Sequence, residues 1–180
     1  RQGVDLHIVK IFNDNGQWTY ASDLIEAISQ CQDAGSNVVN MSLGGGSSST
    51  KELNAMQSFT DAGMLMEAAA GNDGNSAKSY PASYDAVMSV AAVDSNENRA
   101  SYSQYNDQVE IAAPGSAVQS TYPTNTYAAL SGTSMATPHV AGGAALVWSY
   151  FPQCSNNQIR NALNATAEDK GSAGRDNFYG

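Results

Sequence analysis

Ser134 is the residue whose type and surroundings best fit nucleophilic chemistry. It stands in GTSMATPHVAG, residues 132–142, where a loop is expected to enter a helix. The first turn of a helix exposes free backbone N–H groups and favours negative charge, which suits an attacking alkoxide and the oxyanion that follows. Pro138 lies in the early turns and removes a backbone hydrogen bond there, and broken local rules concentrate at functional sites. Taken alone, a serine at such a place is more often an ordinary helix cap.

The chain offers no obvious general base for this serine, although a serine hydroxyl needs one. It has two histidines, His7 and His139. His139 follows Ser134 by five residues on the same expected helix, about 140° around the axis, and cannot easily reach the hydroxyl. His7 falls in an expected strand and is packed or exposed there. Neither histidine is therefore expected to take the proton of Ser134.

The elements that must position Ser134 alternate between strands and helices. Apolar stretches predict the strands, and apolar residues at helical spacing with start and stop signals predict the helices. Strands are expected at 4–12, 38–43, 64–70, 87–93 and 109–112, and helices at 20–34, 49–63, 134–150 and from 155 onward. Ser49 with Glu52, and Ser155 with Gln158, have the spacing of capping boxes. This alternation predicts an α/β fold with parallel strands, covered by helices on both faces.

Two unusual loops are expected at the carboxyl ends of the strands, where such sheets gather their binding sites. One is Ser42-Leu43-Gly44-Gly45, and the other is AAAGNDG at 68–74, which contains Asn72. Taken alone, an asparagine between a glycine and an aspartate is a typical turn residue. The glycine- and serine-rich stretch at 44–49 is better explained as a strand-to-helix loop than as a domain boundary.

Composition excludes several classes of protein. The 180 residues fit one domain, and 42% apolar residues can fill its core. Eight basic against 17 acidic residues give a net charge of −9, so nucleic acid is not expected as a partner. No apolar run reaches the roughly 18 residues of a membrane span. The absence of a Gly-Lys-Ser/Thr sequence after the glycines at 44–46 argues against a nucleotide site.

The stretch around Ser134 resembles the active-site serine segment of the subtilisin-like serine proteases, the subtilases, almost letter for letter. Further stretches resemble the same family, with similar spacing: NMSLGG at 40–45, AAAGNDG at 68–74, YPA at 80–82, AAVD at 91–94 and APG at 113–115. The resemblance covers most of the chain. It implies a three-layer α/β sandwich with a mostly parallel central sheet, incomplete in this chain.

The resemblance assigns roles to individual residues. Ser134 becomes the nucleophile of a serine endopeptidase that works through an acyl-enzyme. Asn72 becomes the side-chain donor to the tetrahedral oxyanion, beside the backbone N–H of Ser134. The segment Ser42, Leu43, Gly44 and Gly45 is expected to pair with an extended peptide substrate as an added strand. Ala69, Ala70 and Gly71 are expected to wall a roomy pocket for a large apolar side chain.

The resemblance also implies a bound cation. Ala82, Tyr84 and Val87 match positions whose carbonyls form a weak cation site in subtilisins, and Glu110 matches a nearby acidic position. Calcium prefers such oxygen ligands, so structural calcium is an expectation from the resemblance alone. An ordinary Tyr-Pro turn explains the same residues as well.

The family's histidine and aspartate are missing, because no HGT-like or DTG-like segment occurs here. In subtilisins the order along the chain is Asp, His, Ser, so both are expected upstream of Arg1. Residues 1–180 are therefore interpreted as the C-terminal two thirds of a catalytic domain. The implied enzyme is secreted and extracellular, made with a removable pro-segment and prone to autolysis, and the implied partners are its own N-terminal part and protein substrates. The alternative is a non-catalytic fragment that binds extended peptides along the segment Ser42–Gly45.

Two further features stay open. Cys31 and Cys154 are either a disulfide or two buried free thiols. Glu67 replaces an apolar residue that the family usually has in the strand before the loop of Asn72, and the sequence does not indicate what its charge meets.

Overall fold

The computed structural model describes residues 3–15 and 21–180 of the chain. Along the sequence the elements alternate largely as expected, with four helices and six strands in the described part. They are α1 (Ala21–Asp33), β1 (Val38–Met41), α2 (Thr50–Asp61), β2 (Leu65–Ala69), β3 (Met88–Val93), β4 (Val109–Pro114), β5 (Val118–Tyr122), β6 (Thr126–Leu130), α3 (Thr133–Tyr150) and α4 (Asn156–Thr166).

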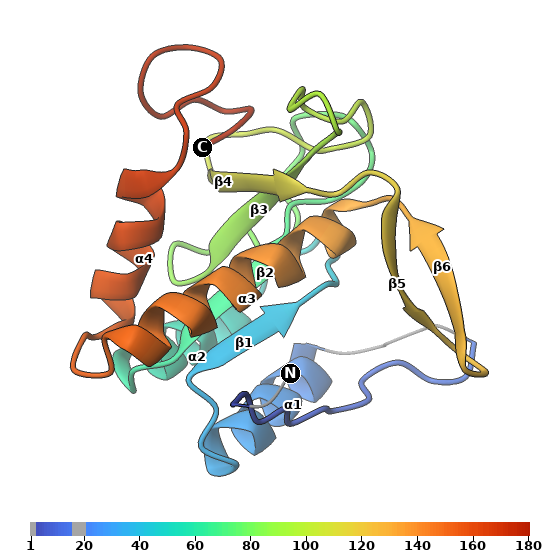
Figure 1. Ribbon diagram of the computed structural model, residues 1–180. Helices are drawn as coiled ribbons and strands as arrows, with labels where there is room; N and C mark the ends of the chain where they lie inside the picture. Colours follow the sequence, from blue (N-terminus) through green and yellow to red (C-terminus); the bar gives the residue numbers. More distant parts are fainter. Residues whose placement is uncertain (1–2, 16–20) are drawn as a thin grey trace.

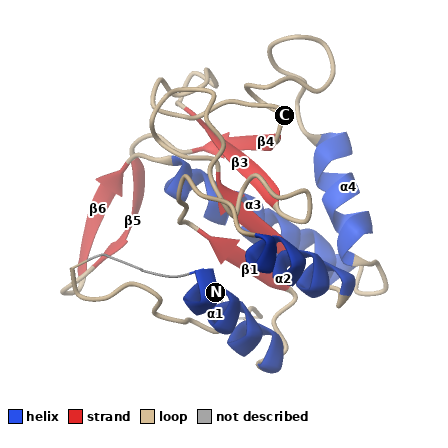
Figure 2. Cartoon of the chain, turned by 180° about the vertical axis from the view of Figure 1, so that it is seen from behind, coloured by secondary structure: helices blue, strands red, loops and turns tan. Residues whose placement is uncertain are grey.

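A four-stranded parallel sheet forms the middle layer of the molecule, with strand order β1-β2-β3-β4. Helices α3 and α4 cover one face in Figure 1, and α1 and α2 cover the opposite face in Figure 2. Among the described helices, only α2 lies between two strands of this sheet in the sequence, as the crossover from β1 to β2, while α1 precedes the sheet and α3 and α4 follow it. The predicted α/β three-layer arrangement is confirmed.

Each face of the sheet has its own apolar core. The α1–α2 side gathers methionine, leucine, isoleucine and phenylalanine side chains, including Met56, Met66 and Phe59. The α3–α4 side gathers smaller residues, including Val90, Ala136 and Ala144. Cys31 packs against the first core and Cys154 against the second, and both are free thiols. Of the two alternatives for the cysteines, the structure has the free thiols, and burial raises the pKa of Cys31.

The strand expected at 4–12 is absent, and this prediction is wrong. Residues 4–11 run as irregular chain below β1 in Figure 1. Their apolar side chains point largely into solvent, with Val4 53%, Leu6 80% and Ile8 84% exposed. A strand needs a neighbour for its backbone N–H and C=O groups. None of the described strands lies beside this segment, so its apolar composition alone does not make it a strand.

The hairpin of β5 and β6 was not predicted from the sequence. Its strands pair antiparallel, with Val118 opposite Leu130 and Tyr122 opposite Thr126. Figure 1 shows it standing away from the central sheet. Every residue of the two strands is exposed or half-buried. Since neither face is buried, the sequence lacks the apolar alternation by which a strand is recognised.

The helix starts follow the capping signals in two different ways. Ser155 and Gln158 form the complete capping box that was predicted for α4. At α2 only half of the box forms, because Ser49 accepts from the backbone of Glu52, while the Ser49 N–H donates to the Tyr84 hydroxyl. That hydroxyl in turn donates to the Glu52 carboxylate at 2.8 Å. Burial raises the pKa of Tyr84 to about 12, so the hydroxyl keeps the proton that it donates to Glu52.

Helix α3 packs on the sheet through a row of small side chains, among them Ala136, Val140 and Ala144. Gly142 and Gly143 take no part in this packing, because Gly142 is exposed and open space surrounds the position of a Cβ on either glycine. Within the described ranges, none of the helices combines the length and the apolar character that a bilayer crossing requires.

Glu67 lies in the middle of β2 and is fully buried. Leu65, two residues earlier in the strand, packs on the α3–α4 side. Side chains two residues apart share a face, so the carboxyl group of Glu67 faces that same core. Neither of its side-chain oxygens has a hydrogen-bond partner in the described part of the chain. Desolvation raises the pKa of Glu67 well above its usual range, with Arg160 on α4 lowering it and Glu110 on β4 raising it. Burial therefore favours the neutral form of the Glu67 carboxyl group over its ionised form.

Stability is expected to fall with rising pH because of Glu67. Above about pH 4.5 the unfolded carboxyl is ionised while the folded one keeps its proton. The folded state then binds one more proton, so the free energy of unfolding decreases by up to about 1.4 kcal/mol per pH unit until the folded pKa is passed. Glu67→Gln removes this slope. Urea unfolding from about pH 5 to about pH 9 measures it.

The exposed Glu26 on α1 offers a matched control, since Glu26→Gln also removes one carboxyl. Its unfolding curve should keep the slope of the parent protein. Equal slopes for the parent and Glu67→Gln would show that Glu67 ionises without cost in the folded state.

Candidate active site

The loop after β2 meets the first turn of α3 through Asn72 and Thr133. The carboxamide oxygen of Asn72 accepts two hydrogen bonds from Thr133, one from the backbone N–H at 2.8 Å and one from the hydroxyl at 3.0 Å. The same hydroxyl oxygen accepts the N–H of Gly71 at 3.2 Å. The carboxyl end of β2 and the N-terminus of α3 are therefore joined by three hydrogen bonds around one threonine.

These contacts fix which way the carboxamide of Asn72 points. Because its oxygen is held by Thr133, its NH₂ group is the part left to donate elsewhere. A Cβ placed on Gly132 would lie 3.5 Å from Asn72 Nδ2, so the NH₂ group lies against the chain just before Thr133. Asn72 itself is exposed. The arrangement presents an oriented N–H donor at the surface, beside the start of α3.

Ser134 follows Thr133 and lies at the second helical position after the N-cap residue, Gly132. Its side chain is half-buried, and among the described residues none forms a hydrogen bond with its hydroxyl. The backbone carbonyl of Ser134 accepts the hydroxyl of Ser42 at 2.8 Å. The loop after β1 is thereby brought to the same helix end, so residues 42, 72 and 134 belong to one corner of the molecule.

The segment Ser42–Gly45 lies against the turn at Tyr80. Gly45 donates its N–H to Tyr80 O at 2.8 Å, and Tyr80 N–H returns to Gly45 O at 2.7 Å. A Cβ on Gly44 would lie 2.5 Å from the Ser79 hydroxyl oxygen, which explains glycine at this position. Since the N–H of Gly45 is already used, Ser42, Leu43 and Gly44 are the residues left to pair with an added strand.

The residues expected to wall a substrate pocket form the end of β2 and the bend after it. Ala69 and Ala70 are buried, and the N–H of Ala70 donates to Val90 O at 3.0 Å. Gly71 has φ +115°, a backbone conformation that residues with a Cβ rarely adopt. A hollow of about 650 Å³ between β4, the end of α4 and the C-terminal residues contains none of these site residues.

Neither histidine approaches Ser134. His139 is exposed, and its Nδ1 lies 2.9 Å from the carbonyl oxygen of Met135 on its own helix. His7 is exposed in the irregular segment before α1. In the described part of the chain, a general base for Ser134 is therefore lacking.

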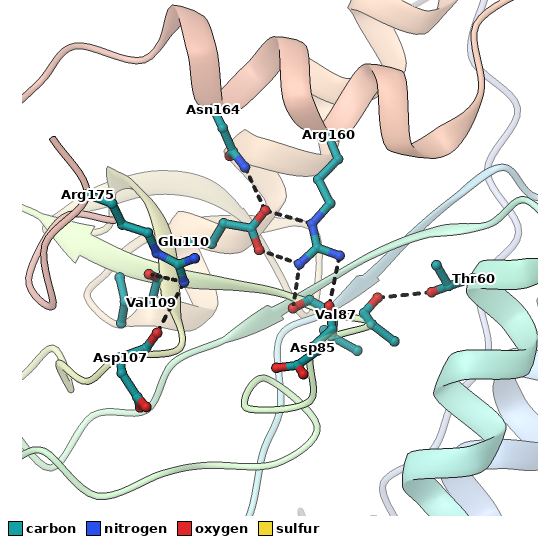
Figure 3. Close-up of polar contacts among 10 residues, drawn as sticks. Thr60, Asp85, Val87, Asp107, Val109, Glu110, Arg160, Asn164 and Arg175 are labelled. Atoms are coloured by element: carbon teal, nitrogen blue, oxygen red, sulfur yellow. Dashed lines mark hydrogen bonds and ion pairs between the residues drawn. The ribbon is translucent and has the colours of Figure 1, made fainter.

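The three carbonyls expected to bind a cation fit that role poorly. The guanidinium of Arg160 lies over one of them, with Nη2 3.5 Å from Val87 O, while its Nη1 donates to the neighbouring Asp85 O at 3.0 Å (Figure 3). Tyr84 O already accepts the N–H of Val87. Within the described ranges, three or more His, Cys, Asp or Glu side chains nowhere gather to hold a metal ion. The positive charge of Arg160 thus lies beside one of the three expected carbonyls, which disfavours a second cation there.

Arg160 also clamps α4 onto β4. Its Nε donates to Glu110 Oε1 at 2.6 Å, its Nη2 forms an ion pair with Glu110 Oε2, and Asn164 adds a further hydrogen bond to Oε1 at 2.7 Å. Figure 3 shows the guanidinium between the Glu110 carboxylate and the carbonyls of residues 85 and 87. Glu110, matched in the sequence to an acidic position near a cation site, instead pairs with an arginine.

Thr133 is the site residue that the sequence analysis missed. It lies inside the quoted stretch GTSMA, and a hydroxyl residue in the first turn of a helix is a usable signal, since such hydroxyls bind backbone groups nearby. What the sequence does not contain is the partner, because Thr133 and Asn72 are 61 residues apart.

Comparison with known proteins decides the family. The model of the subtilase family matches residues 1–180, the whole chain. The chain belongs to the subtilase family. Among curated relatives, this subtilase is 47% identical over 180 residues to subtilisin DY of Bacillus licheniformis and 48% identical over 176 residues to subtilisin BL of Lederbergia lenta. In both comparisons 98% of this chain and 64% of the relative are covered.

A solved structure confirms the subtilisin-like fold. The crystal structure of a psychrophilic subtilisin-like protease from the Antarctic psychrotroph Pseudoalteromonas sp. AS-11 matches with a TM-score of 0.92 and 32% identity. The match covers the whole of this subtilase chain and 75% of that protein. The chain therefore spans somewhat less than two thirds of the two subtilisins, within the same fold.

Removing Arg160 should destabilise this subtilase strongly. The side chain of Glu110 is 9% exposed, so Arg160→Ala leaves a nearly buried carboxylate without its cation. We expect a loss of about 3 kcal/mol in the free energy of unfolding, measured with urea at neutral pH. Adding Glu110→Gln to Arg160→Ala should recover part of that loss.

Arg175→Ala is the matched control, because Arg175 donates to the neutral carbonyls of Asp107 and Val109 (Figure 3). We expect a loss of about 1 kcal/mol for this variant. Equal losses for the two arginines would mean that the pairing of Arg160 with Glu110 adds nothing.

Proposed function

We propose that this subtilase chain carries the nucleophile and the oxyanion donor of a serine endopeptidase. The observation that carries the proposal is the pair of hydrogen bonds from Thr133 to the Asn72 oxygen, which turns the Asn72 NH₂ group toward the helix end where Ser134 lies. Oriented donors at a helix N-terminus are the arrangement that stabilises a developing oxyanion. Membership of the subtilase family supports the same assignment.

The proposed reaction begins when Ser134 Oγ attacks the carbonyl carbon of a peptide bond. A base takes the hydroxyl proton, and the carbonyl oxygen becomes an oxyanion held by Asn72 Nδ2 and the backbone N–H of Ser134. The tetrahedral intermediate collapses, the C–N bond breaks, and the same base returns the proton to the leaving amine. Water then attacks the acyl-enzyme, forms the carboxylic acid product and restores the serine hydroxyl.

The base and its orienting acid are proposed to come from outside these 180 residues. The support is that His139 binds its own helix and that His7 is exposed in an irregular segment. In subtilisins both partners precede the serine in the sequence, so we assign them to an N-terminal part of the same protease. Residues 1–180 are then the C-terminal two thirds of a catalytic domain, bound to that part.

The substrate is proposed to be an extended protein segment that pairs with the chain after β1. Ser42, Leu43 and Gly44 supply the backbone groups, while Gly45 is held by Tyr80. Ala69, Ala70 and Gly71 line the pocket for the substrate side chain that precedes the cleaved bond. Small residues leave room, so large apolar side chains are the proposed preference.

Two further assignments follow from family membership and stay proposals. We infer that the protease works outside the cell and is made with a removable pro-segment. Calcium at the carbonyls of Ala82, Tyr84 and Val87 would lie close to the positive charge of Arg160, whose Nη2 is 3.5 Å from Val87 O. None of the proposed chemical steps depends on calcium.

A fluorophosphonate probe tests the nucleophile directly. In the protease that combines this chain with its histidine and aspartate, the probe should modify Ser134, located by peptide mass spectrometry. Ser134→Ala should abolish labelling. Asn72→Ala should slow it strongly, since loss of this donor costs about 10²–10³ in turnover in subtilisin itself.

Absence of labelling in a folded sample would favour the second function, binding of extended peptides without cleavage. That function predicts retention of an unstructured peptide by Ser134→Ala and by the parent protein alike. Labelling at a serine other than Ser134 would contradict both assignments.

A further inference from the structure

The loop that carries Asn72 is supported from behind by the segment 102–105. Three backbone hydrogen bonds join the two stretches: Gln104 N–H to Gly71 O at 3.0 Å, Gly74 N–H to Tyr102 O at 2.7 Å, and Tyr105 N–H to Asn75 O at 3.0 Å. The loop therefore has a second attachment in addition to Thr133. Thr133 orients the side chain of Asn72 and holds the N–H of Gly71, while the segment 102–105 holds the backbone of residues 71, 74 and 75.

The side chain of Gln104 occupies the space directly behind Gly71. Gln104 is 4% exposed. A Cβ placed on Gly71 would lie 1.7 Å from Gln104 Oε1 and 2.4 Å from its Cδ, so the carboxamide lies directly against the Gly71 backbone. Its Nε2 donates to Ala77 O at 2.7 Å, which fixes the carboxamide in that place. Glycine at 71 and glutamine at 104 are thus complementary in shape.

The backbone of Gly71 is consequently held through its N–H, its carbonyl and its Cα. Its N–H donates to the Thr133 hydroxyl, its carbonyl accepts from the backbone of Gln104, and its Cα packs on the Gln104 carboxamide. The next residue is Asn72. An oxyanion donor is effective only when it is placed before the reaction, and a displacement of about 1 Å can cost about 10²-fold in rate.

We propose that Gln104 is a positioning residue for the oxyanion donor: its buried carboxamide, wedged between Gly71 and Ala77, sets the place of Asn72. This inference rests on the proposed function of Ser134 and Asn72. It assigns to Gln104 no contact with substrate. Its effect passes through Gly71, and is therefore expected in the step where the oxyanion forms.

The test is a comparison of kcat and KM for Gln104→Ala in the protease that contains this chain with its histidine and aspartate. We expect kcat to fall about 10- to 100-fold while KM changes by less than about twofold, because transition-state stabilisation is lost and substrate contacts stay. In an Asn72→Ala background, Gln104→Ala should cause no further loss, since the donor it positions is gone.

Asn106→Ala provides the matched control. Asn106 is also buried and also donates to Ala77 O, at 3.1 Å, but the contact of Gly71 is with Gln104. Its removal should lower stability and leave kcat within about twofold, as expected for a lost hydrogen bond away from the reacting atoms. If Gln104→Ala does not fold, Gln104→Asn, whose carboxamide is one methylene shorter, replaces it in the same comparison.

Three results would overturn the inference. They are an unchanged kcat in Gln104→Ala, a fall in kcat from Gln104→Ala that is as large in the Asn72→Ala background as in the parent, and a fall in kcat in Asn106→Ala as large as in Gln104→Ala. An inactive and unlabelled parent protease would instead count against the proposed function. The two failures are therefore distinguishable.

Discussion

Two hydrogen bonds from Thr133 to the carboxamide oxygen of Asn72 are the constraint on which the site depends. They join the carboxyl end of a buried strand to the first turn of a buried helix, so two elements fixed by separate packing meet at one side chain. Each element is positioned by its own core contacts, β2 on both faces of the sheet and α3 through its small residues. The amide group that remains free is oriented by the rigid parts around it, which is what a preorganised donor requires.

The site residues in recognisable stretches could be predicted from the sequence, whereas their connections could not. Ser134 and Asn72 stand in stretches that resemble the subtilases, and the structure brings their loops together through Thr133. Gln104 had no such signal, because a buried glutamine becomes meaningful only when the missing Cβ of Gly71 and the carbonyl of Ala77 are seen around it. Contacts between residues tens of positions apart are decided by packing, which a local pattern does not encode.

The same distinction explains the fold. Amphipathic helices with capping signals, such as α4, follow from sequence because their information is local. The segment at 4–12 has strand-like composition, but it lacks a neighbour, and the hairpin of β5 and β6 forms although its sequence lacks a buried face. The carboxyl group of Glu67 is hidden in a strand that otherwise reads as apolar. The segment at 4–12 and Glu67 are decided by distant parts of the chain, whereas the hairpin pairs two strands that are neighbours in the sequence.

Strand β1 ends the four-stranded sheet, with β2 as its neighbour on one side. In the described part of the chain, its other side faces no strand, and Asn40 in its middle is exposed. Such an edge is a template on which a further extended chain can add, including one from a second molecule of the same kind. Only four residues long, it offers a short template. A strand added at this rim would pair beside Asn40, whose carboxamide contacts the Ser42 hydroxyl, so the edge of the sheet and the candidate site are neighbours.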